Sequence, residues 1–110
     1  MKRDFLRKMQ ERVAKSFLDM LILTKLRKEP KSAYGIFVSI DRKLRFRVNS
    51  STVYSIVYSL MRDGLIENSE QRRAKVYRLT DKGERTVQAF LNTRKHTQAF
   101  LASLLESLGD

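Results

Sequence analysis

The spacing of apolar residues changes once along this chain of 110 residues, just after Gly64. Before Gly64, apolar residues recur every three or four positions, as in helices with one buried face. Between Leu65 and Leu79 two short segments have the character of β-strands, and after Thr80 the helical spacing returns. Three helices, a hairpin and a long final helix predict a mainly α fold with a small β-hairpin (α+β). This is the order of a winged helix-turn-helix with an N-terminal helical extension.

A stripe of apolar residues predicts the first helix, from about Asp4 to Arg27. The stripe recurs every fourth residue, at Phe5, Met9, Val13, Phe17 and Leu21. The helix should end at Glu29-Pro30, because a residue before proline avoids helical geometry. We expect the stripe to pack on the C-terminal helix, since it is too continuous to stay exposed. The outward cations could also contact DNA, and binding to an anionic membrane is the remaining alternative.

Two shorter helices are predicted from their terminal residues. Ser32 and Asn49 are suited to N-cap them, and Gly64 to end the second, because glycine takes positive φ freely. The helix after Asn49 should be about 14 residues long. Inward positions are Ala33, Ile36, Phe37, Ile40 and Leu44 in one helix, and Val53, Ile56, Val57 and Leu60 in the other.

The hairpin and the last helix follow. Residues 65–68 and 75–79 are expected to form the strands, with a polar, basic tip between them. Thr80-Asp81 should cap the final helix, although Gly83 stands where a capping box has a glutamate or glutamine. The polar stretch 92–98 is where this helix is expected to bend or break.

The charge balance points to a polyanionic partner. Lysine and arginine number 23 against 12 acidic residues, a formal net charge of +11. Nucleic acid and anionic membrane are the leading partners for such an excess, and a highly charged surface for solubility is the alternative. The longest apolar run, Phe17–Leu23, contains Asp19 and is too short to span a membrane. With no cysteine, a cytoplasmic protein is expected, without a membrane partner.

The helix after Asn49 has the composition of a recognition helix. Short hydroxyl side chains let a helix approach the major groove closely, and tyrosine hydroxyls reach phosphates. No acidic residue lies between Arg42 and Arg62. The alternative is a serine-rich face exposed to solvent. The residues predicted to bind DNA here are Asn49, Ser50, Ser51, Thr52, Tyr54, Ser55 and Tyr58.

The hairpin tip is the second predicted DNA contact. Arg72, Arg73 and Lys75 could lie over the phosphate backbone or enter a minor groove. Basic hairpin tips also occur for solubility alone, so this prediction depends on the recognition helix that precedes it.

The chain ends carry more apolar surface than a small core can cover. We expect them to form a homodimer, with residues 1–80 as the DNA-binding domain and 81–110 as a dimerisation helix. Packing within one chain is the alternative. The predicted dimer residues are Phe5, Met9, Val13, Phe90, Phe100, Leu101, Leu104, Leu105 and Leu108.

Enzyme chemistry has little support in the sequence. The single histidine, His96, lies in a polar helical stretch, the glycines form no phosphate loop, and no carboxylates have metal-ligand spacing. We therefore expect no enzymatic activity, no metal and no cofactor.

Four motifs in order resemble the PadR family of bacterial and archaeal transcription regulators. They are Ala33-Tyr34-Gly35-Ile36 after Pro30, Thr52-Val53-Tyr54-Ser55, Asp63-Gly64-Leu65-Ile66, and Tyr77-Arg78-Leu79-Thr80-Asp81-Lys82-Gly83. Ala33 replaces a glycine of the family pattern, Ser55 a proline, and Ser50-Ser51 a Pro-Gly pair.

The resemblance covers about residues 16–90 and implies a homodimer whose C-terminal helices pair with the partner's N-terminal region. It also implies repression at a palindromic operator, with Thr52 and Tyr54 at positions that contact DNA. Some members of the family respond to phenolic acids or drugs at the dimer interface. Because this chain lacks tryptophan and has a short C-terminal region, a small-molecule effector stays an open question.

Together these features predict a dimeric, sequence-specific regulator that binds double-stranded DNA in a prokaryote, acting as a repressor. The alternative is a winged helix that binds another protein through Tyr54, Tyr58 and the C-terminal leucines.

Overall fold

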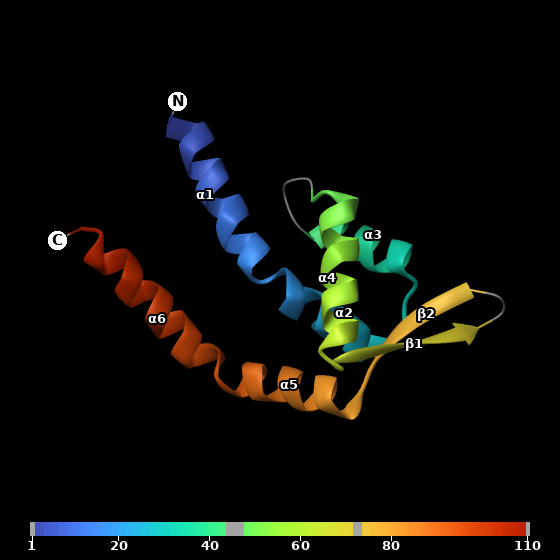
Figure 1. Cartoon of the computed structure of the whole chain (residues 1–110). Helices are drawn as coiled ribbons and strands as arrows, with labels where there is room; N and C mark the ends of the chain where they lie inside the picture. Colours follow the sequence, from blue (N-terminus) through green and yellow to red (C-terminus); the bar gives the residue numbers. More distant parts are fainter. Residues whose placement is uncertain (1, 44–47, 72–73, 110) are drawn as a thin grey trace.

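The computed structural model describes residues 2–43, 48–71 and 74–109 (Figure 1). Its elements are α1 (Lys2–Ser16), α2 (Leu18–Lys28), α3 (Ala33–Lys43), α4 (Ser50–Arg62), β1 (Ile66–Gln71), β2 (Ala74–Leu79), α5 (Asp81–Asn92) and α6 (Arg94–Ser107). The predicted mainly α fold with a small hairpin is confirmed. Leu44, expected to be buried, lies outside the described residues.

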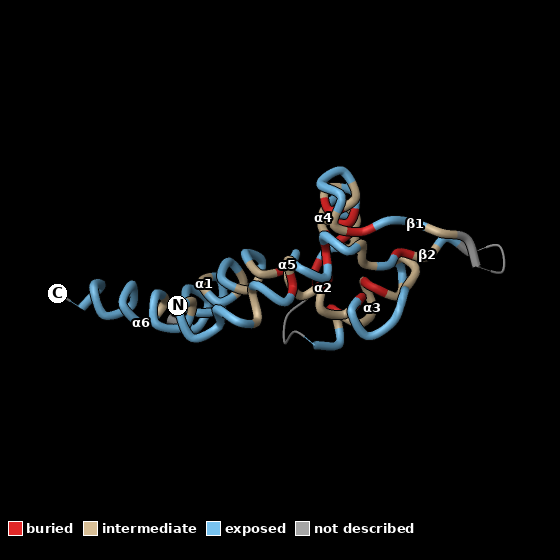
Figure 2. Tube along the Cα trace, turned by 90° about the horizontal axis from the view of Figure 1, so that it is seen from below, coloured by how far each residue is buried: buried red, intermediate tan, exposed pale blue. Residues whose placement is uncertain are grey.

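The molecule consists of a packed body and two projecting helices, α1 and α6, which we call the arms (Figure 1). Its principal extents are 55 × 32 × 21 Å and its radius of gyration is 15.8 Å, against about 13 Å for a compact domain of about 100 residues. Every buried hydrophobic residue described lies between Leu18 and Val87, so neither arm contributes to the core (Figure 2).

Helix α2 is the centre of the core. Leu18, Ile22, Leu23 and Leu26 are buried at spacings of three and four residues, and α2 packs against α3, α4, β2 and α5. Burying one such side chain stabilises the fold by about 1.5–3 kcal/mol. The predicted inward residues of the next helices follow this pattern, with Ile36, Ile40, Val53, Val57 and Leu60 buried and Ala33, Phe37 and Ile56 half-buried.

The ends of α4 are fixed as its sequence predicts. The Asn49 side chain accepts a hydrogen bond from the Ser51 amide at 3.0 Å, which satisfies one free donor of the first turn. At the other end Gly64 has φ 75°. The Gly64 amide donates to Met61 and the Leu65 amide to Leu60, both at 3.0 Å, the pattern by which a left-handed glycine closes a helix.

The antiparallel hairpin is longer than predicted. Its register pairs Ile66 with Leu79 and continues to Gln71 with Ala74, because backbone pairing extends into the polar segment that hydrophobic alternation cannot mark. At the base, Lys31 and Tyr77 exchange two backbone hydrogen bonds, of 3.1 and 2.8 Å. Lys31 therefore forms an isolated antiparallel β-bridge with Tyr77 of β2.

Two helix breaks set the direction of the arms. The single first helix predicted from Asp4 to Arg27 is wrong, because the chain turns at Phe17 (φ −109°, ψ 7°). The expected break in the last helix falls at Thr93, with nearly the same angles (φ −109°, ψ 13°). The rings of Phe17 and Phe90 meet edge to face with centroids 6.4 Å apart. Apolar residues keep the same spacing through Phe17, so the sequence pattern does not indicate the turn.

The expected packing of the N-terminal stripe on the C-terminal helix is found only at this joint. Phe5 is 68% and Val13 45% exposed, and α1 and α6 diverge from the joint (Figure 1). Because the two helices diverge, Phe5 and Val13 have little cover within the chain.

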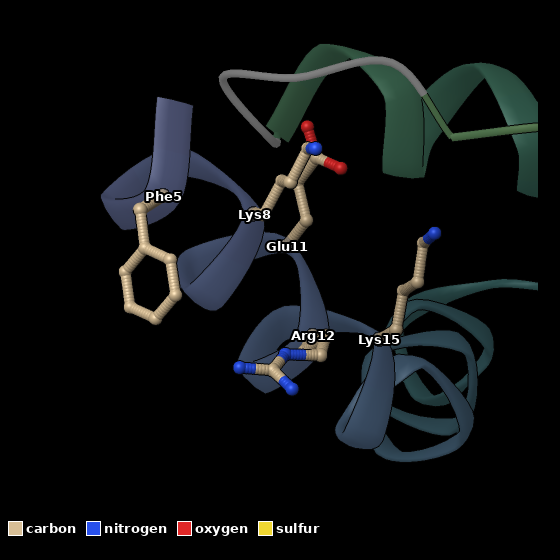
Figure 3. A pocket seen from close by; sticks show the side chains of 5 residues that line it. All are labelled: Phe5, Lys8, Glu11, Arg12 and Lys15. Atoms are coloured by element: carbon tan, nitrogen blue, oxygen red, sulfur yellow. The ribbon is translucent and has the colours of Figure 1, made fainter. Parts of the chain in front are cut away.

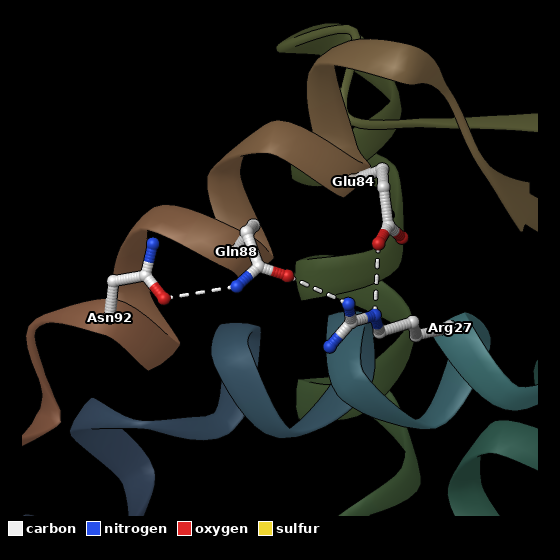
Figure 4. Close-up of polar contacts among 4 residues, drawn as sticks. All are labelled: Arg27, Glu84, Gln88 and Asn92. Atoms are coloured by element: carbon white, nitrogen blue, oxygen red, sulfur yellow. Dashed lines mark hydrogen bonds and ion pairs between the residues drawn. The ribbon is translucent and has the colours of Figure 1, made fainter.

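Helix α5 is held on the body by a polar network (Figure 4). The Arg27 Nε donates to Glu84 Oε1 at 2.9 Å and its Nη2 to Gln88 Oε1 at 2.8 Å. The Gln88 amide donates in turn to Asn92 Oδ1 at 3.0 Å. These contacts and the buried Val87 fix the direction in which the C-terminal arm leaves the body.

Candidate DNA-binding surface

Helix α4 presents one exposed stripe to solvent. Ser51, Ser55, Tyr58 and Arg62 are exposed and follow one another at spacings of four, three and four residues, which places them on one face. The predicted residues Ser50, Thr52 and Tyr54 are half-buried, while Asn49 is exposed. Tyr54 packs against the core, so its ring also has a structural role.

Two exposed residues were not among the predicted contacts. Arg62 ends the exposed stripe of α4, and the spacing from Tyr58 could have found it. Tyr34, in the first turn of α3, is 67% exposed, and its ring is braced by Phe37 at a centroid distance of 6.3 Å. An exposed, braced tyrosine can donate a hydrogen bond at little entropic cost.

The start of α4 favours an anionic ligand. Its first turn contains no acidic residue, and the amides at a helix N-terminus carry partial positive charge. Both the amide and the hydroxyl of Ser51 donate to Asn49 Oδ1, at 3.0 and 2.9 Å. Asn49 therefore orders the first turn through its oxygen and keeps its amide group for other partners.

The hairpin leaves the body beside α4 (Figures 1 and 2). Lys75 is exposed, whereas Arg78 forms an ion pair with Glu67 at 2.9 Å. The other predicted wing residues, Arg72 and Arg73, lie outside the described residues. The charge of Arg78 is thus engaged within the hairpin.

Tyr77 of β2 is part of the core. Tyr77 is 4% exposed, and burial, with a smaller effect of nearby Tyr58, raises the pKa of its phenol. Tyr58 itself is 56% exposed. The buried ring of Tyr77 therefore holds β2 on the body, where β2 packs against α2, α3 and α5.

Five of the predicted dimer residues line one groove between the arms, namely Met9, Val13, Phe100, Leu101 and Leu104. Phe5, Phe100, Leu105 and Leu108 are each at least 66% exposed, and Met9, Phe90 and Leu101 are half-buried. A groove of about 520 Å³ between the arms is lined by α1, by Phe17 and by Thr97, Phe100, Leu101 and Leu104 of α6. The fold thus brings two stripes that are distant in sequence to one groove.

A family model described as the transcriptional regulator PadR-like family matches residues 22–89, more than half of the chain. The chain belongs to the PadR-like family. As members of this family are DNA-binding transcriptional regulators, the expectation that the chain is not an enzyme is confirmed. A search of curated protein sequences finds no significant match.

Solved structures of transcriptional regulators, two of them described as PadR-like or of the PadR family, have the same fold. The regulator from Eggerthella lenta is 26% identical, each chain covering 96% of the other, with a TM-score of 0.77. A PadR-like regulator from Bacillus cereus is 20% identical over 86% of this chain and 96% of its own (TM-score 0.75). A transcriptional regulator from Clostridium thermocellum is 23% identical over 83% and 92% (TM-score 0.70).

The described helices include none with the length and apolar character that crossing a membrane requires. His96 is exposed on α6. No group of three or more potential metal ligands of the histidine, cysteine or carboxylate type occurs among the residues that the structure describes.

Proposed function

We propose that this PadR-like regulator recognises a specific double-stranded DNA sequence, with α4 in the major groove and the hairpin as a wing on the backbone or in the minor groove. The observation that carries the proposal is the exposed stripe of Ser51, Ser55, Tyr58 and Arg62. It offers short hydroxyls, a phenol and a guanidinium, groups that read base edges and bind phosphates. The net charge of +11 supplies the attraction.

The regulator acts as a homodimer in this proposal, with residues 81–110 as the dimerisation segment and residues 1–80 as the DNA-binding part. The supporting observation is the exposed apolar surface on both arms, which is unfavourable in water and is covered best by the same surface of a second copy. A twofold dimer presents two α4 helices to a palindromic site. A dimer seated on such an operator represses by occupying it, in the cytoplasm where the DNA lies.

DNA recognition is tested with Ser55→Ala, which removes one exposed hydroxyl without touching the core. DNA selected by the wild-type protein from a random library serves as the specific probe and a scrambled duplex as the non-specific one. Ser55→Ala should weaken binding to the selected DNA more than to the scrambled duplex, because base contacts specify and phosphate contacts do not. The control is Ser103→Ala, the same change at an exposed position of α6.

The wing is tested with Arg72→Ala/Arg73→Ala, which should weaken binding to both probes alike. Unchanged binding of both probes at ~100 mM salt, where phosphate contacts contribute strongly, would show that the wing does not touch DNA.

The dimer is tested by sedimentation. Leu104→Glu places a charge in the groove between the arms and should convert the dimer to a monomer, whereas Ala99→Glu, on the opposite face of α6, should not. A wild-type monomer that shifts no DNA at low salt would instead favour the alternative, a protein-interaction module using Tyr58 and the C-terminal leucines.

A further inference from the structure

Helix α1 carries a second surface beside its apolar stripe. Lys8 and Lys15 are exposed and lie seven residues apart, which is two helical turns. At 3.6 residues per turn they are rotated by roughly 110° from the stripe of Phe5, Met9 and Val13. The partner copy that covers the stripe in the proposed dimer therefore leaves these two lysines free to contact something else.

This lysine pair borders the recognition helix. Lys15 lines a hollow of about 290 Å³ together with Ile56 and Ser59 of α4, and Ser59 lies next to the exposed stripe of α4. A second hollow of about 530 Å³ runs along α1 from Phe5 to Lys15 and includes Lys8 (Figure 3). In both overall views α1 lies on one side of α4 and the hairpin on the other (Figures 1 and 2).

The acidic groups nearby leave this surface positive. Glu11, between the two lysines, pairs with Arg7 at 3.5 Å, and Arg12 adds a further cation. Asp19 and Asp63 line the hollow beside Lys15, but Asp63 lies at the C-terminal end of α4. Asp4, which is also exposed, lies about one helical turn before Lys8. Helix α1 still carries six lysine or arginine residues against the two carboxylates Asp4 and Glu11, so its surface stays positive.

We propose that Lys8 and Lys15 contact the sugar–phosphate backbone of DNA on the side of α4 opposite the hairpin. DNA is the occupant because the surface is solvent-exposed, positive and continuous with the face of α4. A membrane would require the apolar stripe that the dimer covers. The inference rests on the proposed DNA binding by α4, and it makes the DNA-binding surface three-part, with the hairpin, α4 and the lysine pair in that order.

The test uses the full chain and a mixed-sequence duplex of about 30 base pairs, titrated between about 50 and 200 mM salt. Each phosphate contact contributes about 0.9 to the slope of log affinity against log salt, so Lys8→Gln/Lys15→Gln should lower the slope by about 1.8. Its affinity at ~100 mM salt should fall roughly tenfold or more. Lys8→Gln and Lys15→Gln alone should each lower the slope by about 0.9, and Lys8→Arg/Lys15→Arg should bind like the wild type.

The control is Arg85→Gln/Lys95→Gln, which removes the same charge from exposed positions on α5 and α6. It should leave the slope nearly unchanged. An unchanged slope in Lys8→Gln/Lys15→Gln, or an equal fall in the control, would overturn the inference while leaving α4 binding intact. A wild-type protein that binds no duplex would overturn the proposed function itself. Loss of binding to anionic vesicles with a wild-type DNA slope would assign the lysines to a membrane instead.

Discussion

Gly83→Ala should strongly destabilise the protein. Gly83 is buried in the first turn of α5, and a Cβ there would overlap the carbonyl oxygen of Leu65 and lie 3.1 Å from both the Leu65 carbonyl carbon and Leu79 Cδ2. The Leu65 carbonyl also accepts the Thr80 amide at 3.1 Å. The neighbour that must move is therefore backbone, which already holds the base of the hairpin to the start of α5.

The magnitude follows from three opposing effects. Overpacking costs about 1–3 kcal/mol, and weakening the Thr80 hydrogen bond costs about 1 kcal/mol. Replacing glycine by alanine inside a helix returns about 1 kcal/mol. The free energy of unfolding should fall by about 1–3 kcal/mol, and the Tm by roughly 4–20 °C.

Gly35→Ala is the matched control. Both glycines are the third residue after a capping hydroxyl and donate their amide to it, Gly35 to Ser32 at 3.0 Å and Gly83 to Thr80 at 3.1 Å. A Cβ at Gly35 meets only the Ser32 Oγ, at 3.3 Å, and the Lys31 Cβ, at 3.6 Å. Gly35→Ala should therefore stay within about 1 kcal/mol of the wild type. Urea unfolding followed by circular dichroism at equal protein concentration measures both, and equal stabilities of the two variants would refute the packing argument.

Three further changes test other parts of the structure. Burial raises the pKa of the Tyr77 phenol. The stability that this group contributes is therefore complete below its ordinary pKa near 10.0 and is lost as the pH rises through the raised value. Tyr77→Phe should reduce the loss of stability at alkaline pH, and parallel curves of stability against pH for the two proteins would contradict this. Asn49→Ala removes the α4 cap and should cost about 1 kcal/mol in urea unfolding, with Asn49→Asp close to wild type. Arg27→Gln breaks a half-exposed ion pair with Glu84 and should lower the free energy of unfolding by less than about 1 kcal/mol. A larger decrease in urea unfolding would show that the network of Figure 4 does more than orient α5.

The body of the fold could be predicted because its signals are local. Asn49, Gly64 and Thr80 mark element ends through capping and positive φ, and these choices depend on neighbours only a few residues away. Apolar spacing located the inward faces of α3 and α4 for the same reason. The outward stripe of α4 then follows from geometry, although Arg62 was overlooked at its end.

The features that were missed depend on tertiary contacts. The turn at Phe17 leaves the apolar period unbroken, and it brings the Phe17 ring to Phe90, which lies far away in sequence. The strand-like pairing of Lys31 with Tyr77 is likewise non-local. Gly83 looked like a flaw in a capping box, and its reason becomes visible only when the Leu65 carbonyl is placed against it.

In the proposed function, two copies of α4 read two symmetry-related DNA half-sites. Hydroxyl-radical footprinting of the selected DNA bound to the wild-type protein tests it most directly. We predict two protected half-sites with twofold symmetry, their centres separated by about one helical turn, 10–10.5 base pairs, or a multiple of it. A single protected half-site, or uniform protection without sequence preference, would contradict the account.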